Sequence, residues 1–131
     1  MNRLAPVSLA VAAILASCAL VLPEETRYLQ GAQGRDSQDQ VMRHLGRPLL
    51  MTAGPKGNAV WVYQFREQEA GNRWTSTGLW CDEYVLTFDD QSILRDWTHQ
   101  SQFHGGELMP TYCVPGGAMA PMAAKARTEQ R

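Results

Sequence analysis

Two histidines and a glutamate lie close together late in the chain, at His99, His104 and Glu107. A protein zinc site needs three or four nitrogen, sulfur or oxygen ligands that converge on one point. The stretch around these residues reads as a loop, and spacing within a loop does not supply such convergence. We therefore predict no metal site and no cofactor.

Acidic residues occur as two adjacent pairs that could carry acid–base chemistry. Asp82 and Glu83 fall within a predicted strand and so point to opposite faces, whereas two catalytic carboxylates must face one substrate. Asp89 and Asp90 are typical of a tight turn. The sequence holds no glycine-rich phosphate loop and no Gly-x-Ser-x-Gly motif. We predict that the chain is not an enzyme and has no catalytic residues.

The three cysteines leave at least one without an internal partner. The first of them, Cys18, ends a segment with Arg3 near its start and no charge from Leu4 to Ser17, as in a secretory signal. The other two, Cys81 and Cys113, would meet an oxidising compartment in a secreted protein. We predict a disulfide between them, with two buried free thiols as the alternative.

The residues before Cys18 carry a more specific signal. Leu15-Ala16-Ser17-Cys18 resembles the lipobox of bacterial lipoproteins. The resemblance implies that residues 1–17 are a cleaved signal peptide and that Cys18 is lipidated, with palmitate-type acyl chains as the membrane anchor. Ala19, in place of an Asp, implies the periplasmic face of the outer membrane. Two alternatives remain open: a transmembrane anchor over Leu4–Leu22, and ordinary secretion with cleavage near Ala19.

Tryptophan is the other residue type that could mark a functional surface. Trp61 and Trp80 lie in predicted strands, and we expect both in the core. Trp74 lies in a polar stretch beside Arg73, where burial is harder to arrange. An exposed Trp beside an Arg is typical of a binding anchor, so Trp74 is a candidate contact residue, with partial burial over the sheet as the alternative.

The elements that would position these residues begin with one helix. Residues 18–36 read as a lipidated tether, with one short helical turn around Tyr28 at most. Ser37 and Gln40 then have the spacing of a capping box. Apolar residues at helical spacing follow, Gly46 can cap the carboxyl end and Pro48 prevents continuation. The pattern predicts a helix over residues 38–45.

Three strands are predicted after this helix. Residues 49–59 carry loop signals, whereas 60–65, 79–88 and 93–97 are rich in β-branched and aromatic residues. The predicted fold is α+β: a two-layer sandwich in which the short helix packs on a three-stranded antiparallel meander, over residues 37–114. Residues 115–131 show no pattern and are predicted to be a disordered tail.

Size and charge limit the function classes. The chain has 131 residues, one domain's worth, and a formal net charge of −1. Nucleic-acid binding needs clustered Lys and Arg, and no basic run is present. We therefore expect no nucleic-acid partner.

The order of several motifs resembles a known family. These motifs are a Ser37 cap, Leu45-Gly46-Arg47-Pro48 at a helix end, an aromatic strand ending in Phe65-Arg66, and Leu86-Thr87-Phe88-Asp89 before a turn. Behind a lipobox, this order is similar to the SmpA/OmlA (BamE-like) family of outer-membrane lipoproteins, which has two helices before its strands. The resemblance implies a non-catalytic lipoprotein that assists outer-membrane protein assembly or envelope integrity.

The same resemblance implies a role for two neighbouring residues. In the family, the Phe-Arg pair at the end of the strand contacts partner proteins and anionic phospholipid, so Phe65 and Arg66 become candidates. A guanidinium can bind a phosphate or carboxylate through two hydrogen bonds. The alternative is a core Phe65 followed by a solvated Arg66. For the whole chain, the alternative function is a periplasmic inhibitor or binding module that resembles β-lactamase inhibitory proteins.

Overall fold

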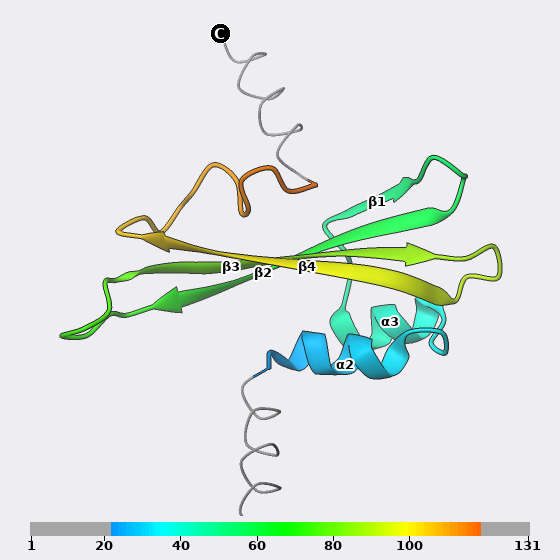
Figure 1. Ribbon diagram of the computed structural model, residues 1–131, viewed down its shortest axis with the longest axis horizontal. Helices are drawn as coiled ribbons and strands as arrows, with labels where there is room; N and C mark the ends of the chain where they lie inside the picture. The colour runs from blue at the N-terminus through cyan, green and yellow to red at the C-terminus, as the bar shows by residue number, and fades with distance from the viewer. Residues whose placement is uncertain (1–21, 119–131) are drawn as a thin grey trace, which may run out of the picture. The chain divides into compact units, whose positions relative to one another are not determined.

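The computed structural model describes residues 22–118 (Figure 1). The predicted signal peptide, the lipidation site Cys18 and the alternative cleavage near Ala19 lie outside this range. So do all residues of the alternative transmembrane anchor except Leu22, and residues 119–131 of the predicted tail. The chain divides into two compact units, with the boundary after Gly31. Within residues 22–118, no helix combines the length and the apolar character that crossing a membrane requires.

The described residues contain two helices, where the sequence predicts one. α2 spans Glu24–Ala32 in the segment predicted to be a tether. Two acidic residues in its first turn, Glu24 and Glu25, favour a helix start because they complement the helix dipole. The predicted tether is therefore helical over nine of its residues.

The predicted helix is confirmed as α3, Gln38–Leu45. Its capping box is complete: the Gln40 amide donates to the Ser37 hydroxyl at 3.4 Å, and the Ser37 amide donates to Gln40 Oε1 at 2.8 Å. Gly46 has a φ of 81°, which favours glycine, and its amide donates to the Met42 carbonyl. Both helix ends are thus set by residues that can be read directly from the sequence.

The sheet has four antiparallel strands in the order β1-β2-β3-β4, not three. They are β1 (Leu50–Ala53), β2 (Ala59–Glu69), β3 (Gly78–Phe88) and β4 (Leu94–Gly105). β1 lies in the stretch predicted to be a loop. β2 and β4 also continue well past their predicted ends. The predicted α+β class is confirmed, whereas the prediction of three strands was wrong.

One face of the sheet carries the aromatic core and faces α3; we call it the helix face (Figure 1). Trp61 contacts Phe88 with ring centroids 4.7 Å apart, and both are buried. The Tyr63 hydroxyl donates to the Gly46 carbonyl at 2.9 Å, which ties the sheet to the end of α3. Burial raises the pKa of Tyr63 to about 12, because the phenolate would lose hydration.

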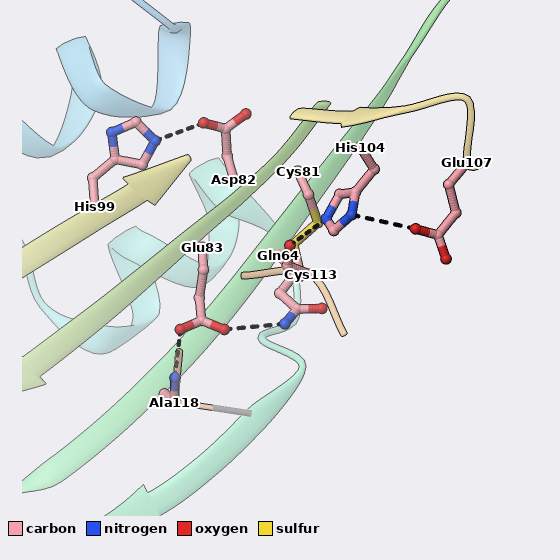
Figure 2. The surroundings of a disulfide bond; sticks show 9 residues. All are labelled: Gln64, Cys81, Asp82, Glu83, His99, His104, Glu107, Cys113 and Ala118. Carbon is pink, nitrogen blue, oxygen red and sulfur yellow. Dashed lines mark hydrogen bonds and ion pairs between the residues drawn. A yellow bond between two sulfur atoms is a disulfide. The ribbon is translucent and has the colours of Figure 1, made fainter. Parts of the chain in front are cut away.

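The opposite face is crossed by residues 106–118, which we call the strap (Figure 1). The predicted disulfide is confirmed: Cys81 in β3 joins Cys113 in the strap, with Cα atoms 5.4 Å apart. Glu83 is 3% exposed, and its carboxylate accepts hydrogen bonds from Gln64 Nε2 at 3.1 Å and from the Ala118 amide at 2.6 Å (Figure 2). Residues 115–118, predicted to begin a disordered tail, are therefore held against the sheet.

Candidate interaction surface

The loop between β2 and β3 presents the most exposed aromatic side chain of these strands and their loops. Trp74 is 88% exposed. Its backbone is nevertheless fixed, because Asn72 Oδ1 accepts from the Trp74 amide at 2.7 Å and from the Thr75 amide at 2.9 Å. The Arg73 guanidinium carbon lies 5.9 Å from the centroid of the indole ring. The ring is thus held outward, and the alternative of partial burial over the sheet does not hold.

A second aromatic group lies on the helix face at the same end of the sheet. Trp80 and Phe103 contact each other across β3 and β4, with ring centroids 4.9 Å apart. Trp80 is 41% exposed, so the prediction that it belongs to the core was wrong. It lies eight positions before the buried Phe88 on the same face, towards the end of the sheet that leads into the loop carrying Trp74. Trp74, Trp80 and Phe103 thus lie at the same end of the sheet, and we call these three residues the aromatic surface.

The structure separates the predicted Phe65–Arg66 pair. Consecutive residues of a strand point to opposite faces, and Phe65 shares the helix face with Tyr63 and Tyr84. Its ring stacks on Tyr63 at 6.1 Å and meets Tyr84 edge-on at 5.8 Å, so it is half-buried in the aromatic core. Arg66 is exposed on the strap face. The two side chains cannot meet one ligand together, although each can meet a partner separately.

An aspartate and a histidine form the clearest polar pair on the helix face. Asp82 Oδ1 and His99 Nε2 are 2.7 Å apart, and each side chain is about a quarter exposed (23% for Asp82 and 24% for His99). The His99 ring stacks nearly parallel on Tyr84, with centroids 4.3 Å apart. Asp82 and Glu83 point to opposite faces, as predicted (Figure 2). The pair links β3 to β4 across the sheet and holds the imidazole in place.

A shallow recess of about 260 Å³ lies between β4 and the strap, lined by Gln102, His104, Glu107, Pro110, Thr111, Tyr112 and Pro115. His104 Nε2 lies 2.6 Å from the Cys113 carbonyl, which can only accept, so this nitrogen carries the proton. His104 Nδ1 lies 3.8 Å from the Glu107 carboxylate. The recess is smaller than most small-molecule sites, and its histidine fastens the strap beside the disulfide.

The histidines and carboxylates do not gather in one place. His99 and His104 are separated by five positions in β4, an odd number, so their side chains lie on opposite faces of the sheet. Among residues 22–118, no group of three or more His, Cys, Asp or Glu side chains is placed to hold a metal ion. The aromatic surface is the feature of the described chain that is best suited to recognition.

Comparisons with known proteins found no match for this chain. No family model matches the chain, and no curated protein or solved structure matches it significantly.

Proposed function

We propose that the protein is a non-catalytic, lipid-anchored lipoprotein on the periplasmic face of the outer membrane, which assists outer-membrane protein assembly or envelope integrity. It acts through protein contacts made by the aromatic surface and through contact with anionic phospholipid. The observation that carries the proposal is the outward-held Trp74, 88% exposed in a loop fixed by Asn72. A large apolar ring held in water by an ordered loop is typical of a binding anchor.

The cysteines support the compartment in this proposal. A disulfide that joins a central strand to the strap persists in the periplasm and is rare in the reducing cytosol. It uses both cysteines of the described residues, which leaves Cys18 for the lipid. The disulfide and the lipobox therefore favour the same side of the inner membrane.

The lipid contact is assigned to Arg66. Its side chain is exposed near the C-terminal end of β2. A guanidinium there can bind a phospholipid phosphate through two hydrogen bonds. Since Phe65 is part of the aromatic core, its role in this proposal is to hold that end of β2 in place rather than to touch the lipid.

Lipidation is tested on the intact chain. The mature protein is expected to begin at Cys18 and to exceed the mass of the polypeptide 18–131 by the mass of its acyl groups. Cys18→Ser is expected to move the protein from the membrane fraction to the soluble fraction, because the acyl chains provide the anchor. Intact-mass spectrometry and fractionation give the answer. An unmodified chain that begins near Leu20, or an uncleaved one, would falsify the lipid anchor.

Partner binding is tested by affinity purification from detergent-solubilised membranes. The parent is expected to recover outer-membrane assembly proteins. Trp74→Ala is expected to reduce their recovery by about tenfold or more, as truncation of an anchor residue does. Its folding should be unaffected, since exposed substitutions usually change stability by no more than about 0.5 kcal/mol.

Met109→Ala is the matched control for that experiment. Met109 is 89% exposed, like Trp74, but belongs to the strap. It is expected to recover partners as the parent does. Equal losses in both variants would mean that general surface apolarity, not Trp74, drives recovery. Recovery of a soluble periplasmic enzyme in place of assembly proteins would favour the alternative of an inhibitor or binding module.

A further inference from the structure

The outer half of β2 is an open edge. β1 pairs with β2 only over Ala59–Val62. Over residues 22–118, no strand pairs with that side of Gln64–Glu69, while its other side pairs with β3 through Glu69. We call Gln64–Glu69 the open edge. Proline residues and β-bulges are two common features that block further strand pairing. The open edge contains no proline, and its pairing with β3 shows no register shift.

The hydrogen-bonding groups of the open edge can be assigned by alternation. The Leu49 amide donates to the Val62 carbonyl at 2.8 Å, so the backbone groups of Val62 point towards β1. In an antiparallel strand, the amide and carbonyl of one residue point to one side and those of the next residue to the other. The amides and carbonyls of Arg66 and Gln68 therefore point outward. Those of Glu67 point towards β3.

Side-chain charge also alternates along this edge. Phe65, Glu67 and Glu69 lie on the helix face, whereas Gln64, Arg66 and Gln68 lie on the strap face. Arg66 to Gln68 are all exposed. A strand added here would meet acidic side chains on one face and a guanidinium on the other. The loop with Trp74 follows Glu69 directly, so the edge is continuous with the aromatic surface.

We propose that an extended peptide segment of the protein partner adds to the open edge as an antiparallel strand. Its basic residues lie opposite Glu67 and Glu69, an acidic residue lies opposite Arg66, and an apolar residue lies opposite Phe65. The backbone bonds supply affinity and the alternating charges supply register. This inference rests on the proposed function, whose partner it describes.

A second copy of this chain fits the open edge poorly. An antiparallel pair of two identical edges centred on Arg66 would place the two guanidinium groups directly opposite each other. Centring the pair on Glu67 would do the same with two carboxylates. Like charges directly opposite each other in a sheet are destabilising. In both of these registers, charge complementarity therefore favours a strand of different sequence over a second copy of this chain.

The probe is a capped hexapeptide, Lys-Thr-Lys-Glu-Val-Thr, which reads antiparallel to the open edge. In amide NMR spectra of the full chain in micelles, its addition is expected to shift and protect the amides of Arg66 and Gln68. The amides of Phe65 and Glu67 should change little, since they already face β3. A peptide with the Lys and Glu residues exchanged should bind at least about tenfold more weakly, because each charge pair becomes repulsive.

Gln68→Pro is the decisive variant. It removes an outward amide and no bond to β3, so the sheet should keep its melting temperature, whereas peptide binding should fall by about tenfold or more. Gln68→Ala keeps the amide and should bind like the parent. If Gln68→Pro does not fold, the same binding measurement is made on Arg66→Pro, which also removes an outward amide.

Each other outcome overturns the inference. Equal binding by Gln68→Pro and Gln68→Ala, or protection without alternation, would exclude strand addition. Concentration-dependent dimers that Gln68→Pro abolishes would assign the edge to a second copy. Peptide binding that appears only after removal of residues 119–131 would assign the edge to the chain's own end. If Gln68→Pro still recovers the membrane partners that Trp74→Ala loses, the proposed function stands and this inference fails.

Discussion

Replacing Cys81 and Cys113 together by alanine is expected to lower the free energy of unfolding by about 3–4 kcal/mol. The bond closes a loop with a sequence separation of 32 residues, and much of its effect comes from restricting the unfolded chain. It also holds the strap on the sheet, together with the His104 and Glu83 hydrogen bonds. Small domains have limited core, so this is a large share of their stability.

The measurement is equilibrium denaturation by urea under non-reducing conditions, with Cys18 retained in both proteins. Parent protein treated with a reductant should approach the double variant, because both lose the same cross-link. Non-reducing peptide mapping should recover Cys81 linked to Cys113. Coincident transitions for the parent and the double variant would mean that the strap is held without the bond.

Phe88→Ala is expected to cost about 3–5 kcal/mol, the range for removing a fully buried aromatic side chain. Phe88 is 0% exposed and packs on Trp61. Its neighbours belong to a hydrogen-bonded sheet and are expected to relax only partially into the cavity. Thermal and urea denaturation give the loss. A variant that melts like the parent would contradict the helix-on-sheet core described above.

Trp80→Ala is the matched control. It removes a larger aromatic from the same strand and the same face. Because Trp80 is 41% exposed and its ring lies against that of Phe103, its loss should cost only about 1–2 kcal/mol. The contrast between the two variants measures how much of the helix face is core and how much is surface.

The elements that were predicted well are those whose limits are written in local residues. α3 has its predicted bounds because Ser37, Gln40, Gly46 and Pro48 each act within one turn of a helix end. β3 begins one residue from its predicted start, since its residues are apolar or aromatic over most of its length. Local chemistry was sufficient for both.

The elements that were missed depend on pairing. β2 runs on through Arg66–Glu69, and β4 runs on through Thr98–Gly105, although both stretches are polar. They are strands because β3 lies between them and supplies hydrogen-bond partners to both. β1, of four residues, is likewise stabilised by β2. Strand propensity depends on such context, so composition alone could not extend these strands.

The candidate site was predicted in part for the same reason. Trp74 stood out because burial is harder to arrange among its polar neighbours, but the sequence left partial burial over the sheet open, and its 88% exposure is known from the structure. Trp80 was misassigned because alternation gives the face of a residue but not how far along that face the core extends. For Phe65 and Arg66, the family resemblance suggested a joint contact site, whereas strand geometry places the two side chains on opposite faces.

The strap also has a consequence for the order of events during synthesis. The four strands pair only with their sequence neighbours, so each hairpin can form soon after its two strands have been synthesised. Glu83 and Cys81, however, gain their partners only from groups that follow all four strands in the chain, the Ala118 amide and Cys113. Until then, a carboxylate and a thiol in the centre of the sheet stand open to water and to oxidants. This face of the sheet is therefore completed only after all four strands and the strap have been made.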